Sequence, residues 1–103
     1  MGKIGSRKII IARKKRFWGF VLEYYVVVDN KIYAKVKNGK TVQFDVDCNM
    51  HELYLYGIFQ GNDGKKMKIE SNQVVIPEDK SMHTYYIDTK AGLVENKLML
   101  FEA

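Results

Sequence analysis

Hydrophobic and polar positions alternate through the first half of this chain. In three consecutive segments every second residue is apolar, and the residues between are mostly charged or polar. Successive side chains of a β-strand point to opposite faces, so this period of two predicts strands with one buried and one solvent-facing side. Asp29-Asn30 and Asn38-Gly39 separate the segments, and both pairs tolerate the positive φ of tight hairpin turns. The three segments, expected to form a meander, are residues 22–29, 31–36 and 41–46.

Shorter runs of the same kind occur before and after this meander. Further strands are expected at residues 8–13, 50–59, 66–70, 73–76, 83–88 and 97–101. No segment shows a helical period, and turn residues separate the runs every 8–12 residues or so, as is typical of sandwiches and barrels. The sequence therefore predicts an all-β fold, a single-domain antiparallel β-sandwich of seven to eight strands. The domain is expected to span residues 1–103, with residues 1–7 as a flexible basic N-terminus.

The expected core consists of the inward-facing positions of these strands. They are Ile9, Ile11, Val26, Val28, Ile32, Ala34, Val36, Val42, Phe44, Leu53, Leu55, Ile69, Val74, Ile76, Ile87, Leu98 and Leu100.

Composition places the chain among ordinary globular domains. Of its 103 residues 47% are hydrophobic and 28% charged, which excludes wholesale disorder. Cys48 is the only cysteine, so no internal disulfide can form, as suits a reducing compartment. The chain has no apolar run long enough for a membrane span or a signal peptide. We therefore expect a cytoplasmic protein, or a cell-envelope protein if a leader peptide has been removed.

The net charge of +5 comes from one end of the chain. Residues 1–16 contain seven basic residues and no acidic one, whereas the remainder has ten basic and twelve acidic residues. A groove for nucleic acid across a sheet would distribute lysine and arginine over several strands. The basic character is therefore only a weak argument for a nucleic-acid-binding fold.

The basic-aromatic segment, residues 7–18, is nevertheless one candidate binding site. Cations can neutralise phosphates while aromatic rings stack on bases, and the same composition suits an acidic membrane surface. Alternatively, the aromatic rings cover one end of the core and the cations are simply solvated. The candidate residues here are Arg13, Lys14, Lys15, Arg16, Phe17 and Trp18.

Tyrosines provide the second candidate surface. Tyr25 and Tyr33 alternate with the apolar positions of the meander, and Tyr54 and Tyr56 alternate with Leu53 and Leu55, so all four are expected on the outward side. Tyrosine supplies a large contact area at low entropy cost, which favours a partner-binding surface. Cross-strand pairing that stabilises a solvated sheet is the alternative.

Reactive groups are too few to predict an enzyme. Asp45, Asp47, Cys48 and His51, with His83 further on, could be proposed as a metal or nucleophile cluster. One cysteine and two scattered histidines match no specific ligand pattern, and no orienting third group can be named for Cys48. We therefore expect no catalytic residues, no metal and no small-molecule cofactor.

Several stretches of the chain resemble a group of small bacterial β-sandwich domains of unknown function. These domains are similar in pattern to PEGA-type and carboxypeptidase-regulatory-like sandwiches. The resemblance implies the same fold, no catalytic activity, and a role as a binding or accessory module. The stretches that carry it are Ile11-Ala-Arg13, Phe17-Trp-Gly19, Tyr25-Val-Val-Val-Asp29, Lys37-Asn-Gly39, Met50-His-Glu-Leu53 and His83-Thr-Tyr-Tyr-Ile87.

Together these observations predict a non-enzymatic binding or accessory module for protein–protein interaction. The expected partner is another protein or a second copy of the chain. The alternative is an anion-binding module that engages nucleic acid or acidic lipid through the basic-aromatic segment.

Overall fold

Two β-sheets make up the structure. The computed structural model describes residues 5–13, 23–60, 64–91 and 96–102, which form nine strands and include no helix that could span a membrane. The strands are β1 (Ser6–Arg13), β2 (Tyr24–Val28), β3 (Lys31–Val36), β4 (Thr41–Asp47), β5 (His51–Gln60), β6 (Lys66–Glu70), β7 (Val74–Ile76), β8 (His83–Ala91) and β9 (Asn96–Glu102).

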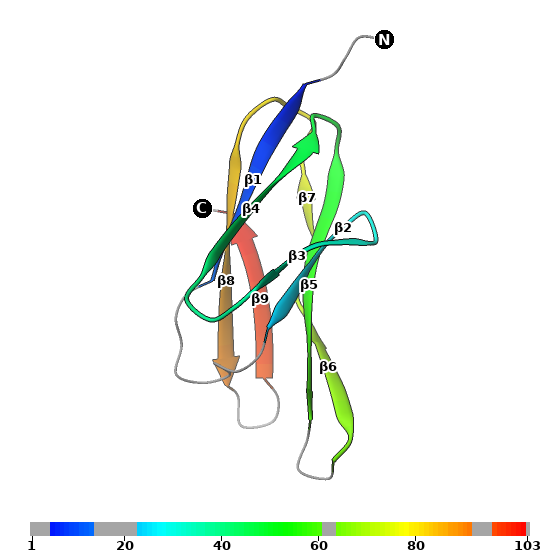
Figure 1. Cartoon of the computed structure of the whole chain (residues 1–103), viewed down its shortest axis with the longest axis vertical. Helices are drawn as coiled ribbons and strands as arrows, with labels where there is room; N and C mark the ends of the chain where they lie inside the picture. Colours follow the sequence, from blue (N-terminus) through cyan, green and yellow to red (C-terminus); the bar gives the residue numbers. More distant parts are fainter. Residues whose placement is uncertain (1–4, 14–22, 61–63, 92–95, 103) are drawn as a thin grey trace.

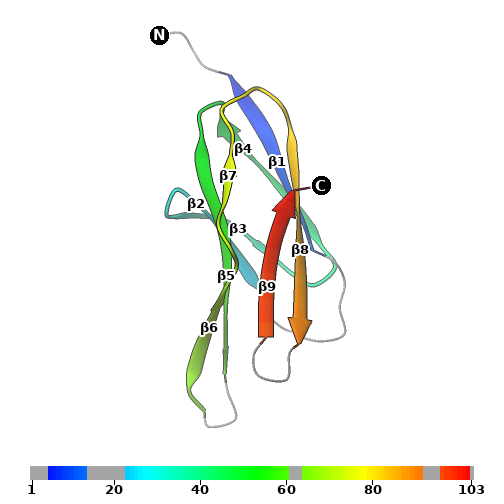
Figure 2. The ribbon, with the colours of Figure 1, turned by 180° about the vertical axis from the view of Figure 1, so that it is seen from behind.

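The two sheets lie face to face. The first sheet has the order β4-β1-β8-β9, and the second has the order β3-β2-β5-β6 with β7 also paired to β5 (Figure 1). The view from behind shows the same two layers, with β8 and β9 in one and β5, β6 and β7 in the other (Figure 2). In both views the β5–β6 hairpin extends past the ends of the other strands.

The predicted all-β, two-sheet architecture is confirmed, with three differences of detail. The described residues form nine strands rather than seven or eight, and β1 and β8 run parallel. A hairpin cannot join two parallel strands. Here the chain forms the strands of the second sheet after β1 and before it returns to the first sheet as β8. β1 also begins at Ser6, inside the segment expected to be a flexible N-terminus, and Arg7 is buried.

The core lies between the sheets and contains most of the predicted inward positions. Tyr24, Val46 and Tyr85 belong to it as well, because they continue the inward alternation of their strands. Ile32 was expected inside but is 57% exposed. The pairing of β2 with β3 shifts between Val26 and Val27, so that Val27 lies opposite Ile32. This bulge turns Ile32 to the outer face.

The predicted hairpin turns are present. Asp29 and Asn30 have φ of 51° and 68°, as a tight turn between β2 and β3 requires, and Gly39 has φ of 73°. These turns place Asp29 and Asn30 at one end of the second sheet, beside the start of β5.

Both β7 and β6 pair with the same edge of β5, one after the other along the strand. Ser71 fills the gap between them: its N–H donates to Leu55 O at 2.9 Å, and its hydroxyl accepts from Leu55 N at 2.9 Å. The next residue, Asn72, reaches the other sheet. Its Nδ2 donates to Leu100 O at 2.8 Å, and Leu100 N donates to its Oδ1 at 3.0 Å. Asn72 therefore ties the second sheet to the free edge of β9.

Substituting Asn72→Ala is expected to lower the free energy of unfolding by about 1 kcal/mol, because both hydrogen bonds to Leu100 are lost at a partly buried edge. Gln73→Ala, at the exposed neighbouring position, is the control and is expected to change it by less than about 0.5 kcal/mol. Urea unfolding of the three proteins measures the difference. Equal stabilities of the two variants would show that the Asn72 bridge does not hold the sheets together.

Candidate functional site

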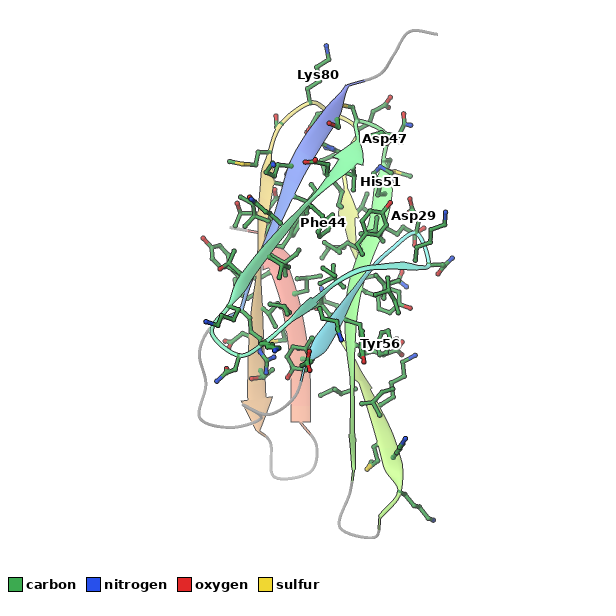
Figure 3. All side chains as sticks on the ribbon, viewed as in Figure 1. Asp29, Phe44, Asp47, His51, Tyr56 and Lys80 are labelled. Carbon is green, nitrogen blue, oxygen red and sulfur yellow. The ribbon has the colours of Figure 1, made fainter. Side chains whose placement is uncertain are left out.

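Three of the four predicted tyrosines gather on the outer face of the second sheet. Tyr25 of β2 lies opposite Tyr56 of β5, and the two rings stack with centroids 4.9 Å apart at 25°. Tyr54 lies opposite Val27 on the same face. Val27 is 3% exposed although it points away from the core. We call these four residues the tyrosine face; Tyr56, on β5, is labelled in Figure 3.

Exposed apolar side chains extend the tyrosine face. Ile32 lies opposite Val27, and Ile58 follows Tyr56 on β5; they are 57% and 48% exposed. Charged side chains surround this centre. Lys68, for example, places its Nζ 4.7 Å from the Tyr56 ring centroid and 3.3 Å from Glu70 Oε2. An apolar, aromatic centre within a charged rim is the composition of protein–protein interfaces.

Tyr33 does not join this group. It is the residue that the bulge of β3 leaves without a partner in β2, and it is 42% exposed. Its ring contacts Phe44 of β4, with centroids 5.2 Å apart. Tyr33 therefore lies where an edge strand of one sheet meets an edge strand of the other.

The basic-aromatic segment is only partly described, and its described arginines are used inside the fold. Arg13 is buried, donates from its guanidinium to Val36 O at 3.0 Å, and lies 4.1 Å from the Tyr24 ring centroid. Arg7 is buried as well. Lys8 is exposed, with its Nζ 3.6 Å from Asp45. The candidate residues Lys14, Lys15, Arg16, Phe17 and Trp18 lie outside the described residues.

Both histidines are held between pairs of carboxylates at one end of the sandwich. His51 places Nδ1 2.5 Å from Asp29 Oδ2 and Nε2 2.7 Å from Asp47 Oδ1. Figure 3 shows these three residues together in the upper part of the molecule. His83 bonds through Nδ1 to Glu102 and through Nε2 to Asp79 Oδ1, the latter at 3.1 Å. Carboxylates on both ring nitrogens fit an imidazolium, which donates from both.

A short motif precedes each of these histidines. Asp47 stands four residues before His51, and Asp79 stands four residues before His83; in each case a turn separates the aspartate from a strand that begins with histidine. This Asp-x-x-x-His repeat could have predicted one of the two carboxylate partners of each histidine. The other carboxylates, Asp29 and Glu102, come from distant parts of the chain and have no such local signal.

The carboxylates raise the pKa of both histidines. At His83 the hydrogen bond with Glu102 is the main cause, and that with Asp79 adds to it. At His51 burial opposes the charge, but the hydrogen bonds with Asp29 and Asp47 together outweigh it, so the pKa is again raised. The hydrogen bond from His51, followed by one from the Glu52 amide, lowers the pKa of Asp29.

Arg7 links the two histidine sites. Its guanidinium donates to Asp79 Oδ1 at 2.9 Å, to Asp47 O at 3.2 Å and to Asn49 O at 2.7 Å. Asp79 belongs to the His83 site and Asp47 to the His51 site. The three cationic side chains and their carboxylates thus form one network, the polar end, which joins strands of both sheets.

The metal or nucleophile cluster considered from the sequence does not assemble as a unit. Of its members, Asp47 and His51 bond to each other, whereas Asp45 lies near Lys8. Cys48 is half-buried, and its Sγ donates to Gly5 O at 3.4 Å. Within the part of the chain that the structure describes, no group of three or more such ligands is arranged to hold a metal ion.

Two of the hollows among the described residues border the segments considered above. The larger, about 380 Å³, lies over the first sheet and is lined by Ala12, Arg13, Tyr86, Ile87, Asp88 and Phe101. It borders Arg13, where the described part of the chain is interrupted, and no site is assigned to it. The smaller, about 140 Å³, adjoins the tyrosine face and is lined by Asp29, Asn30, Glu52, Tyr54 and Gln73.

Fold and site together define a class, a two-sheet all-β sandwich with an aromatic outer face and a charged network at one end. Comparison with models of protein families, with curated proteins and with solved structures finds no match to this chain. The proposals that follow therefore rest on the molecule alone.

Proposed function

We propose that this protein is a non-enzymatic binding or accessory module that docks another protein on its tyrosine face. The observation that carries the proposal is the stacked pair Tyr25–Tyr56 beside Tyr54, flanked by the exposed Ile32 and Ile58. Pre-stacked rings on a rigid sheet lose little conformational entropy when a partner covers them. Residues of this type dominate the binding energy of protein interfaces.

The arrangement of the reactive side chains supports a binding role. In the described residues both histidines use both ring nitrogens to hold the fold together, and Cys48 bonds to a backbone carbonyl. A general base needs a free nitrogen within reach of its substrate.

No specific observation favours the anion-binding alternative. The arginines of the basic-aromatic segment that the structure describes, Arg7 and Arg13, are buried, and their guanidinium groups bond within the fold. Binding of nucleic acid or acidic lipid by the basic-aromatic segment, residues 7–18, stays a prediction from the sequence.

Substituting Tyr56→Ala is expected to weaken binding at least tenfold, about 1.4 kcal/mol, because it removes one ring of the stacked pair. Peptides selected from a random display library on the wild-type protein serve as the probe. Tyr86→Ala is the matched control, since Tyr86 is 40% exposed and pairs with Phe101 on the outer face of the other sheet. Affinity for the control is expected to be unchanged.

Two outcomes would contradict the proposal. One is that no peptide is enriched; the other is that the enriched peptides bind Tyr56→Ala and Tyr86→Ala equally well. Sedimentation of the wild-type protein at high concentration distinguishes self-association from binding of a foreign protein. A dimer that dissociates on Tyr56→Ala would make a second copy of the chain, and not a foreign protein, the partner.

A further inference from the structure

A recess opens at one end of the tyrosine face. It has a volume of about 140 Å³ and five lining residues, Asp29, Asn30, Glu52, Tyr54 and Gln73. They come from the β2–β3 turn, from β5 and from the residue before β7, so three separate segments converge on it. Tyr54 belongs both to the recess and to the tyrosine face, which makes the two surfaces continuous.

The recess is preformed. Asp29 Oδ1 accepts a hydrogen bond from the Glu52 amide at 3.0 Å, and Asp29 Oδ2 faces His51. These contacts fix the turn against β5. The side chains of Asn30, Glu52 and Gln73, by contrast, have no hydrogen-bond or ion-pair partner among the described residues. A rigid frame thus presents polar groups that are free to bind a ligand.

The chemistry of the lining suits a cation that donates hydrogen bonds. Two carboxylates and two amide oxygens are acceptors, and none of the lining residues is a lysine or an arginine. This acidic spot lies on a chain with a net charge of +5. The hydrogen bond from His51 lowers the pKa of Asp29, so this carboxylate remains ionised. The Tyr54 ring adds a surface for a cation–π contact.

The size of the recess indicates one side chain rather than a free small molecule. Its volume of about 140 Å³ corresponds to roughly five water molecules. Sites for whole small molecules begin at about 300 Å³. The head of a basic side chain fits this space while the rest of its chain continues over the tyrosine face.

We propose that the recess receives an arginine side chain of the partner protein. The guanidinium donates two parallel hydrogen bonds to the free carboxylate of Glu52 and stacks on Tyr54, an arrangement that the compact ammonium of lysine cannot reproduce. This inference rests on the proposed function, because the residues next to the arginine cover Tyr25 and Tyr56.

Peptides selected on the wild-type protein test the inference directly. We expect them to contain an arginine next to an aromatic or aliphatic residue. Fluorescence polarisation then compares each peptide with a copy in which citrulline, a neutral isostere, replaces the arginine. Glu52→Gln and the citrulline peptide are each expected to weaken binding at least tenfold. Asp45→Asn is the control, since Asp45 is an exposed carboxylate on the outer face of the first sheet, near Lys8 and away from the tyrosine face; it should change affinity less than twofold.

Each remaining outcome overturns the inference in a different way. Peptides that require Tyr56 but contain no arginine, or that bind Glu52→Gln and Asp45→Asn equally, would refute the arginine site and leave the proposed function standing. Absence of any Tyr56-dependent peptide would refute both. Binding of uncharged oligosaccharides on a glycan array, lost in Glu52→Gln, would assign the recess to a sugar instead.

Discussion

Replacing Arg7 by methionine is expected to lower the free energy of unfolding by about 3 kcal/mol. Arg7 is 4% exposed, and its guanidinium donates to a carboxylate and to two backbone carbonyls at the polar end. Methionine can occupy the space of the aliphatic stem, but it leaves all three acceptors without this donor. Removing one partner of a buried charged network lowers the free energy of unfolding by more than the whole network adds to it. The reason is that the remaining groups stay desolvated without a partner.

Lys8→Met provides the matched control for Arg7→Met. Lys8 is the next residue of β1 and points to the opposite face, where its Nζ lies 3.6 Å from Asp45 and both side chains are exposed. Exposed ion pairs contribute little, so a change below about 0.5 kcal/mol is expected. Urea unfolding at neutral pH measures both variants. A similar small effect for Arg7→Met and Lys8→Met would mean that the polar end does not stabilise the fold.

Stability is expected to be highest in mildly acidic solution and to fall by several degrees in melting temperature towards about pH 8. The folded chain binds the protons of His51 and His83 more tightly than the unfolded chain, because the pKa of both is raised. Their contribution to the stability of the fold is fully present below about pH 6.5, the pKa of a histidine in the unfolded chain. It is lost as the pH rises through the raised pKa values of the folded chain.

The aspartates of the polar end set the acidic limit of the pH range in which the fold is most stable. The pKa of Asp29, Asp47 and Asp79 is lowered in the folded chain. For Asp29 the main cause is the hydrogen bond from His51; for the other two it is a backbone N–H. Their contribution is present above an unfolded pKa of about 4 and is lost as the pH falls through the lowered folded values. The optimum therefore lies between about pH 4 and 6.5.

A double variant, His51→Gln with His83→Gln, isolates the histidine contribution. The chain contains only these two histidines. Melting curves between about pH 5.5 and 8 should show a clear decline for the wild type and a nearly flat profile for the double variant. A wild-type profile that is equally flat, or that rises with pH, would contradict the assignment of both rings as imidazolium bridges.

Local patterns account for most of the fold. The period of two along β2, β3 and β4 predicted their strands and faces, and the turn residues at 29–30 and 38–39 predicted where the chain reverses. These features depend on neighbours in sequence, and a single chain displays them directly. The same alternation placed Tyr25, Tyr54 and Tyr56 on one outer face, where the structure also has them.

Other features depend on which strands meet, and local patterns do not contain that information. The bulge that exposes Ile32 is a property of the β2–β3 pairing. The buried role of Arg7 was missed because it lies in the basic N-terminal part of the chain, although Arg7, Ile9, Ile11 and Arg13 share the inward face of β1. The histidine bridges need carboxylates 22 and 19 residues away, and the fold alone brings these together.

The polar end and the tyrosine face thus have separate tasks. The polar end holds the sheets together and fixes the Asp29 turn, and the tyrosine face next to it presents a rigid surface to a partner. Asp29 connects the two, since one of its oxygens faces His51 and its carboxylate also lines the recess beside Tyr54. Binding and stability should therefore respond to different substitutions.

The central claim is that partners dock on the tyrosine face, and amide chemical shifts during a peptide titration test it most directly. The labelled wild-type protein would be titrated with the tightest peptide from the library selection. We predict that the shifts concentrate on β2, β5 and the 29–30 turn and are absent from β1, β8 and β9. Shifts that concentrate on β8 and β9, around Tyr86 and Phe101, would place the binding surface on the opposite sheet and contradict it.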